Sequence, residues 1–276
     1  MDMDVPSWNC RGICGDSTVR ALKNLISQSC PQIVFICESK ISTRQAFDRL
    51  QMALRFAHGT GVLSEGLSGG LGMFWNDDVR VHVGSSSAHH IDIEIDGGPS
   101  NPRWRLTGFY GWPRTADRDF SWQLLKDLAD LDSLPWVVIG DFNEILNSGE
   151  KKGGPQRQER QMRGFREALG YGDLLDLGFQ GPATTWWNSE TQLRLDRAVR
   201  NPSWCDIFGH ARVQHLLPSD SDHLPILLRS STIPIMKIPH HQRFHFEAYW
   251  LQHIECNDVV KGAWFTDVTG VPMYRV

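Results

Sequence analysis

Residues 136–144 read WVVIGDFNE, a short apolar run that ends in a glycine and an acid, Asp141. A continuous apolar run of this length is typical of a strand that is buried on both faces of a sheet. Residues 33–38 repeat the pattern as IVFICE, with Glu38 after the last apolar position. We therefore predict two buried strands, each of which carries a carboxylate at its carboxyl end.

Helical patterns alternate with these two strands. Apolar residues recur at helical spacing over about 17–29 and about 117–131, and residues 42–54 predict a third helix. Between about 60 and 110, short alternating runs separated by turn residues predict a meander of antiparallel strands, and further strands are predicted at 184–187, 193–199, 211–215 and 224–228. This order predicts an α/β fold, a four-layered sandwich of two packed mixed sheets flanked by helices.

The composition predicts one large domain over residues 3–229. The chain has 276 residues, of which 41% are hydrophobic and 22% charged, so it can bury a substantial core. The first predicted strand has a weak strand pattern, because MDVPS at residues 3–7 places an acid and a proline where an apolar edge strand is expected. After Arg229 the sequence becomes rich in proline and histidine, so we expect residues 230–276 to form a linker and a helical tail at about 244–264.

Charge and hydropathy exclude several classes of protein. A net charge of −4 argues against a nucleic-acid coat protein with a broad basic patch, but it agrees with a carboxylate site that needs a divalent cation before phosphate can approach. No apolar run approaches the ~20 residues that cross a bilayer, and the first residues lack the pattern of a secretory signal. We expect an intracellular protein with no membrane partner.

Residues that bind metal or phosphate stand at predicted strand ends in five motifs. These are WNCRG at 8–12, CESK at 37–40, GDFNEI at 140–145, LDR at 195–197 and SDHLP at 221–225. Hydrolysis of a phosphodiester needs a hard cation on oxygen ligands, a positioned water and groups that stabilise charge on the phosphate, and Asn, Asp, Glu and His supply all three. Taken singly, each motif is explained better by a turn, a helix cap or an ordinary loop.

Together with FYGWP at 109–113 and TWWN at 185–188, these motifs resemble in order and spacing the endonuclease/exonuclease/phosphatase superfamily, which includes AP endonucleases and deoxyribonuclease I-like enzymes. The resemblance covers roughly residues 3–229. GDFNEI, EKKGG at 150–154 and RFHFEAYW at 243–250 are similar to the endonuclease region of plant LINE-type non-LTR retrotransposons. The resemblance implies a Mg²⁺-dependent or Mn²⁺-dependent endonuclease that nicks duplex DNA, in the nucleus, for a retroelement reverse transcriptase.

The same resemblance implies a metal site. Glu38, assisted by Asn9, would hold Mg²⁺, and Asp222 would be a further ligand. Relatives of the AP-endonuclease type carry an acid two residues after the first Asn, whereas this chain has Arg11. A cation at that position competes with metal and favours phosphate, so a second metal and abasic-site repair are not expected to carry over.

The resemblance also implies catalytic roles. Asp141 would orient or deprotonate the attacking water, and Asn143 would bind the phosphate beside it. His223 would contact a phosphate oxygen as the imidazolium, and Asp196 would orient the ring and raise its pKa. Tyr110 matches the position of a phenol near the leaving group, and an aromatic side chain that merely packs under the site explains it equally well.

Contacts to DNA are predicted from Arg11, and more weakly from Trp186 and Asn188, although the TWWN motif also reads as scaffold around the site. A helix after about residue 157 buries Met162, Phe165 and Leu169, and turns arginines 157, 160 and 163 to the opposite face. That face meets either phosphates or, as the simpler interpretation, solvent.

Two further hypotheses remain open. In one, the same fold hydrolyses a phosphoester other than DNA. In the other, the chain is a retroelement remnant that folds and binds DNA but catalyses nothing. Because the sequence keeps each core acid and the histidine, it favours an active enzyme over the remnant.

Overall fold

The computed structural model describes residues 3–13, 15–66, 68–98, 102–217, 221–230 and 258. The chain divides into two compact units, Met1–Pro234 and Ile235–Val276. The predicted helical tail at about 244–264 falls, apart from residue 258, outside the described residues. Within the described part of the chain, no helix combines the length and the apolar character needed to cross a membrane.

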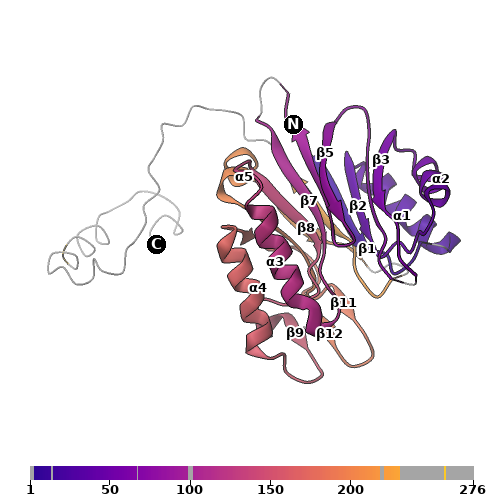
Figure 1. Cartoon of the computed structure of the whole chain (residues 1–276). Coiled ribbons are helices and arrows are strands. Elements are labelled where there is room, and N and C mark those ends of the chain that lie inside the picture. Colours follow the sequence, from indigo (N-terminus) through magenta and orange to yellow (C-terminus); the bar gives the residue numbers. More distant parts are fainter. Residues whose placement is uncertain are drawn as a thin grey trace, which may run out of the picture. The chain divides into compact units, whose positions relative to one another are not determined.

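Two six-stranded mixed sheets and one small sheet form the first unit (Figure 1). The first sheet has the order β14 (Arg212–His215), β15 (Ile226–Ser230), β1 (Met3–Asn9), β2 (Ile33–Cys37), β4 (Leu71–Trp75) and β3 (His58–Val62). The second has the order β10 (Leu175–Asp176), β13 (Asp196–Arg200), β8 (Trp136–Asp141), β7 (Trp104–Tyr110), β6 (His90–Asp96) and β5 (Arg80–Ser87). The small sheet joins β11 (Trp186–Trp187), β12 (Gln192–Leu193) and β9 (Lys151–Lys152).

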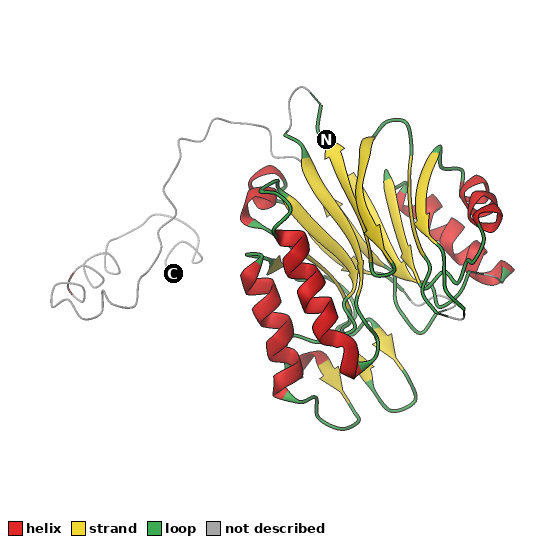
Figure 2. Cartoon of the chain, viewed as in Figure 1, coloured by secondary structure: helices red, strands yellow, loops and turns green. Residues whose placement is uncertain are grey.

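Helices cover the outer face of each large sheet (Figure 2). The first sheet carries α1 (Asp16–Ser29) and α2 (Arg44–Leu54), and the second carries α3 (Arg118–Ala129), α4 (Glu159–Tyr171) and the short α5 (Pro202–Ile207). Two 3-10 turns, η1 (Thr115–Asp117) and η2 (Ser148–Glu150), lie in the loops. The predicted fold, a four-layered α/β sandwich of two packed mixed sheets flanked by helices, is confirmed.

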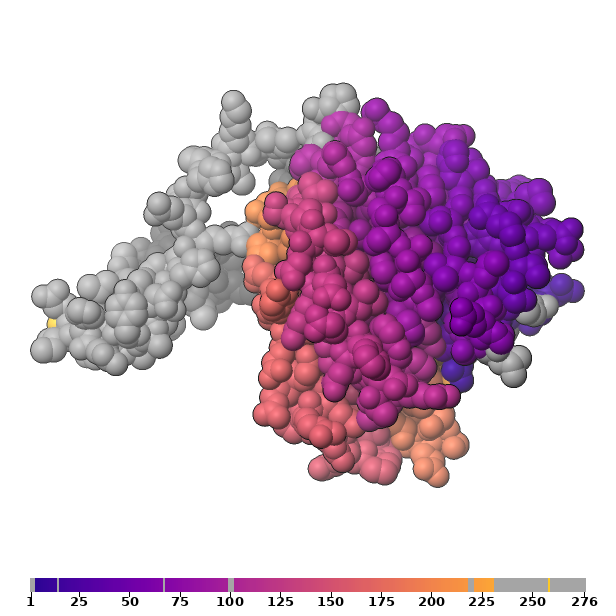
Figure 3. All heavy atoms as spheres, viewed as in Figure 1, coloured from indigo at the N-terminus to yellow at the C-terminus, as the bar shows by residue number. Residues whose placement is uncertain are grey.

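Apolar cores hold the layers together. The central core lies between the sheets and includes Phe35 of β2 and Ile139 of β8. Phe35 occupies this space because β7 has Gly108 opposite it, where a Cβ would lie 2.2 Å from the ring. The outer cores lie under α1 and α2 and under α3 and α4, where Trp122 stacks on Phe165 at 4.6 Å between ring centroids. In the space-filling view α3 and α4 accordingly form one continuous surface (Figure 3).

The strand runs predicted between about 60 and 110 exist, and β5, β6 and β7 form the predicted antiparallel meander, but β4 belongs to the other sheet. β3 and β4 pair with each other in the first sheet, whereas β5, β6 and β7 form antiparallel pairs in the second. The chain therefore crosses between the sheets after β4. Alternating hydropathy fixes which face of a strand is buried, but not which sheet it joins.

The first strand is an interior strand, although its sequence predicts a poor edge. β1 lies between β15, with which it is antiparallel, and β2, with which it is parallel. Pro6 immediately precedes Ser7, which makes the first pair of the β1–β2 ladder, so the missing N–H falls where that ladder starts. Before Ser7, where β1 has no ladder partner in β2, the side-chain oxygen of Gln32 accepts a hydrogen bond from the backbone N–H of Asp4 at 2.8 Å.

Candidate functional site

The predicted site residues from both large sheets meet at one end of the sandwich. β1 ends at Asn9, and Glu38 follows the last residue of β2. In the second sheet β7 ends at Tyr110 and β8 at Asp141, and these two residues are paired in the parallel ladder. β13 runs antiparallel to β8 and begins at Asp196, directly opposite Asp141. Strand register therefore fixes Tyr110, Asp141 and Asp196 beside one another in the second sheet, and Asn9 beside Cys37, the residue before Glu38, in the first.

Asn9 links the two sheets through its side-chain amide. Its Nδ2 donates to Glu38 Oε1 at 3.0 Å and to Asp141 Oδ2 at 2.9 Å. All three side chains are buried, and Asn9 and Asp141 are each only 1% exposed. One amide thus holds a carboxylate of each sheet at hydrogen-bonding distance.

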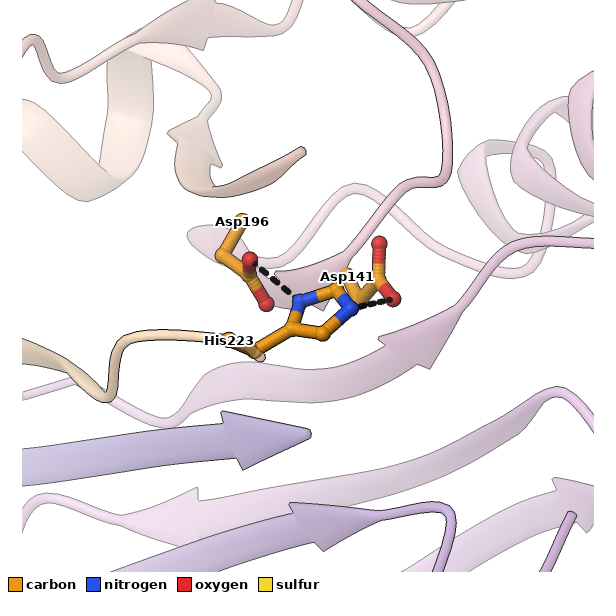
Figure 4. A group of neighbouring side chains, drawn as sticks. All are labelled: Asp141, Asp196 and His223. Atoms are coloured by element: carbon orange, nitrogen blue, oxygen red, sulfur yellow. Dashed lines mark hydrogen bonds and ion pairs between the residues drawn. The ribbon is translucent and has the colours of Figure 1, made fainter. Parts of the chain in front are cut away.

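His223 lies between two carboxylates (Figure 4). Its Nδ1 is 2.9 Å from Asp196 Oδ2, and its Nε2 is 3.8 Å from Asp141 Oδ2. Burial opposes protonation of the ring, but Asp196 and Asp141 outweigh it and raise the pKa of His223 from 6.5 to about 9. Burial also raises the pKa of Asp141 above its ordinary value, while His223 acts against that rise. The ring is therefore oriented by Asp196 and favoured as an imidazolium.

Left-handed backbone shapes the loops that follow β2 and β8. Glu38 has φ 51° and Asn143 has φ 56°, a conformation that costs non-glycine residues about 1–3 kcal/mol and that clusters at functional sites. The backbone N–H of Asn143 donates to Asp141 Oδ1 at 2.8 Å, and its side-chain Nδ2 donates to Gly111 O at 2.9 Å. Asn143 thus closes a tight turn beside Asp141.

Tyr110 directs its hydroxyl at Glu38, the carboxylate that the resemblance implies as a metal ligand. Its Oη donates to Glu38 Oε1 at 3.0 Å, and the residue is 4% exposed. Burial, followed by the charges of Glu38 and Asp141, raises the pKa of the phenol above its ordinary value. Neither interpretation from the sequence, a contact to the leaving group or simple packing, included this hydrogen bond.

Arg11 and Asp222 lie on the exposed side of Glu38. Arg11 Nη1 is 3.3 Å from Glu38 Oε2, and Arg11 Nε is 3.2 Å from Asp222 Oδ1. Trp186 donates its indole N–H to the other oxygen of Asp222 at 2.9 Å. Of the residues predicted to contact nucleic acid, Arg11 and Trp186 are therefore bound to acids of the site. Asn188 is exposed, and its side-chain oxygen accepts from the N–H groups of Glu190 and Thr191 in the β11–β12 turn.

Of the three arginines expected on one helix face, Arg160 and Arg163 are exposed on α4 as predicted, whereas Arg157 is not. Helix α4 begins at Glu159, so Arg157 precedes it, and the Nε of Arg157 donates to the buried Glu144 at 2.8 Å. Arg166 pairs with Glu159, and Arg163 Nε is 3.9 Å from Glu167 Oε1. The predicted buried stripe of this helix is present, with Met162, Phe165 and Leu169 all buried.

Three further residues of the motifs support the site; Ser221 and Trp8 were missed in the sequence, whereas Thr185 belongs to TWWN, for which a scaffold role was predicted. Ser221 Oγ donates to the carbonyl of Asn9 at 2.8 Å and accepts from the N–H of His223 at 3.1 Å. Trp8 donates its indole N–H to the carbonyl of His223 at 3.1 Å. Thr185 Oγ1 accepts from the N–H of Asp196 at 2.9 Å. Their positions within WNCRG, TWWN and SDHLP are the feature of the sequence that could have indicated a role at the site.

A buried ion cluster behind β13 was also missed. It consists of Arg194, Arg197, Glu150 and Asp176. Each arginine contacts both acids at distances of 2.7–3.1 Å, and the Arg197 side chain has no exposed surface. Arg197 follows Asp196 directly, so the cluster holds the residue next to one acid of the candidate site. Charged residues in a sequence are ordinarily read as surface, which is why this cluster went unpredicted.

The donor set of the site fits a hard divalent cation. Mg²⁺ prefers carboxylate and amide oxygens, which Glu38 and Asn9 supply. Three donors, from Asn9, Tyr110 and Arg11, converge on the buried Glu38 carboxylate and fix its orientation. Asp141, Asp196 and His223 also place ligand atoms within 4.8 Å of one another. A protonated imidazole has no free lone pair, so His223 in that form would not be a metal ligand.

The comparisons with known proteins agree with this geometry. The model of the Endonuclease/Exonuclease/phosphatase family matches residues 7–223. Among solved structures, an AP endonuclease from Leishmania major is 14% identical with a TM-score of 0.65, covering 84% of this chain and 88% of that chain. The 3′ phosphatase NExo from Neisseria, bound to a product DNA hairpin, is 16% identical with a TM-score of 0.65, covering 83% and 99%. The endonuclease domain of TRAS1, a telomere-specific non-LTR retrotransposon, is 14% identical with a TM-score of 0.62, covering 84% and 99%.

At these identities the structural likeness concerns the fold, and no curated protein sequence matches the chain. The family match rests on different ground, since it spans most of the chain and includes the whole network from Asn9 to His223. The chain belongs to the endonuclease/exonuclease/phosphatase family of phosphoester hydrolases.

Proposed function

We propose that this protein is a metal-dependent endonuclease that nicks duplex DNA for a retroelement. The observation that carries the proposal is the side-chain network in which Asn9 bridges Glu38 and Asp141, while His223, held by Asp196, faces Asp141 from the other side. The network combines oxygen ligands, an acid that can handle a water and a cationic donor, which are the parts that phosphodiester hydrolysis requires.

Each residue has a part that follows from its contacts. A Mg²⁺ or Mn²⁺ ion held by Glu38 and Asn9 would polarise the phosphate and neutralise its charge. Asp141, fixed by hydrogen bonds from Asn9 and from the backbone of Asn143, orients the water and accepts its proton. His223 offers its Nε2 proton to a phosphate oxygen, and the Nδ1 contact to Asp196 keeps the ring in the orientation this requires.

Two lines of support favour DNA as the substrate. The motifs GDFNEI and EKKGG resemble retrotransposon endonuclease regions, and the solved structures with a similar fold include an AP endonuclease and a retrotransposon endonuclease domain. NExo, a further structural neighbour, is bound to a DNA hairpin. Work on chromosomal DNA beside a reverse transcriptase would place the protein in the nucleus.

The catalytically silent remnant is the second candidate, and one observation favours it. Arg11 occupies two acids of the predicted metal site, Glu38 and Asp222, and a guanidinium there opposes metal binding. The intact contacts among the remaining site residues favour activity instead, because a site under no selection is expected to lose some of its buried polar residues.

A duplex oligonucleotide labelled on one strand tests the proposal. With Mg²⁺ we expect a break in one strand whose 3′ end a DNA polymerase extends without further treatment. This follows if water attacks phosphorus and the 3′ oxygen leaves, which gives a 3′-hydroxyl and a 5′-phosphate. Parallel reactions with a soluble phosphomonoester and with an RNA duplex test the alternative that the protein hydrolyses a phosphoester other than DNA. Cleavage of those substrates but not of DNA would reject the DNA assignment, and no hydrolysis of any of them by folded protein would favour the remnant.

A further inference from the structure

Arg11 makes a two-part contact at the rim of the site. Its Nη1 reaches Glu38 at 3.3 Å, while its Nε reaches Asp222 at 3.2 Å. Its backbone N–H also donates to Asn9 Oδ1 at 3.2 Å, and its φ of 52° turns the chain sharply after β1. The guanidinium is therefore aimed at the carboxylate that is best placed to hold a metal ion.

The two acids hold Arg11 in different ways. The Glu38 side chain is 9% exposed and receives further hydrogen bonds from Asn9 and Tyr110. The Asp222 side chain is 31% exposed, and Trp186 fixes its second oxygen. Because separate nitrogens of Arg11 serve the two acids, the guanidinium can leave Glu38 and keep Asp222. Half of the Arg11 side chain is exposed, so solvent offers room for that movement.

We propose that Arg11 is a built-in cation that occupies Glu38 in the metal-free protein and competes with the divalent ion for it, with Asp222 as its anchor rather than as a metal ligand. This inference rests on the proposed function, because it requires a metal site at Glu38. Charge balance gives the physical reason. A metal ion and a guanidinium both bind an anionic carboxylate, and their mutual repulsion at short range disfavours both being bound at once.

The inference is tested by calorimetric titration of the purified chain with Mn²⁺ at fixed ionic strength. We expect Arg11→Gln to bind Mn²⁺ about fivefold more tightly than wild type, the effect of removing one partly exposed competing ion pair. Arg11→Lys keeps the charge but cannot contact both acids through separate nitrogens, so its affinity should lie between the two. Arg44→Gln is the matched control, since Arg44 pairs with Asp48 on the exposed face of α2.

A double-mutant cycle separates the two roles of Asp222. If Asp222 only anchors Arg11, Asp222→Asn leaves Mn²⁺ affinity unchanged in the Arg11→Gln background. If Asp222 is a metal ligand, the double variant binds Mn²⁺ more weakly than Arg11→Gln alone, and that part of the inference is overturned. Equal Mn²⁺ affinity in wild type and Arg11→Gln would overturn the competition while leaving the proposed function intact. Absence of Mn²⁺ binding in both would overturn the inference and the proposed function together.

Discussion

Arg197 offers the sharpest test of how the site is held in place. We predict that Arg197→Met destabilises the protein, because Arg197 has no exposed surface and bridges Glu150 and Asp176. Its two Nη atoms contact Glu150 at 3.1 and 2.7 Å, and Nη1 contacts Asp176 at 2.7 Å. With methionine in its place, Arg194 is the one cation of the cluster that still neutralises the two largely buried carboxylates, Glu150 and Asp176.

The magnitude follows from that imbalance. Removing one partner of a buried ion pair costs about 3–5 kcal/mol, because the other charge stays buried without compensation. Arg194 still contacts both acids, so we place the loss near the lower end, at about 3 kcal/mol in the free energy of unfolding. Asp196 adjoins Arg197, so the variant should also lose hydrolytic activity through a displaced Asp196.

Urea denaturation followed by tryptophan fluorescence measures the free energy of unfolding. Arg163→Met is the control, since Arg163 is 61% exposed and only 3.9 Å from Glu167, and such exposed pairs contribute about 0–1 kcal/mol. A loss for Arg197→Met no larger than that of the control would refute the reasoning. It would mean that the buried ion cluster does not hold β13.

Three further predictions concern pH, metal affinity and backbone geometry. Burial raises the pKa of both cluster acids, Glu150 and Asp176, but the arginines outweigh it and lower both values. The stability that this contributes is complete above about pH 4.5 and is lost as the pH falls through the folded pKa values. Wild type should therefore lose more stability than Arg197→Met between about pH 5 and pH 3, and parallel curves would contradict this. Tyr110→Phe removes a donor to Glu38 and should weaken Mn²⁺ binding in calorimetry about tenfold, whereas a fall in kcat at saturating metal with unchanged Mn²⁺ affinity would indicate a contact to the leaving group instead. Gly140→Ala should lower the free energy of unfolding by about 2 kcal/mol or more, because φ is 151° and the new Cβ would lie 1.9 Å from the carbonyl oxygen of the paired strand β7; an unchanged urea midpoint would exclude this.

The strands that carry the site were predictable because a short apolar run that ends in an acid is typical of a buried strand and its exit. Residues 33–37 and 136–141 are fully buried strands, as predicted, and strand register then brings Asn9, Tyr110 and Asp141 to one end of the sandwich. Local sequence sets the strand and its exit. The pairing between strands, which is non-local, decides which exits meet.

The sequence was weaker where tertiary context overrides local pattern. β1 reads as an edge because of Asp4 and Pro6, yet partners on both sides bury it. Arg157 follows the helical period in the sequence, but the helix begins two residues later and Arg157 turns to the buried Glu144. Charge and periodicity in a sequence do not reveal a buried partner that lies far away in the chain.

Nicking of a supercoiled plasmid tests the central claim most directly, since conversion to the open circle reports a single hydrolysed phosphodiester. We predict that the wild-type chain nicks the plasmid with Mg²⁺ and not with EDTA, and that His223→Ala and Asp141→Ala, shown to be folded by circular dichroism, each reduce the rate at least about 100-fold. Metal-independent nicking, or nicking that persists in both variants, would contradict the account that the network of Asn9, Glu38, Asp141, Asp196 and His223 is the hydrolytic centre.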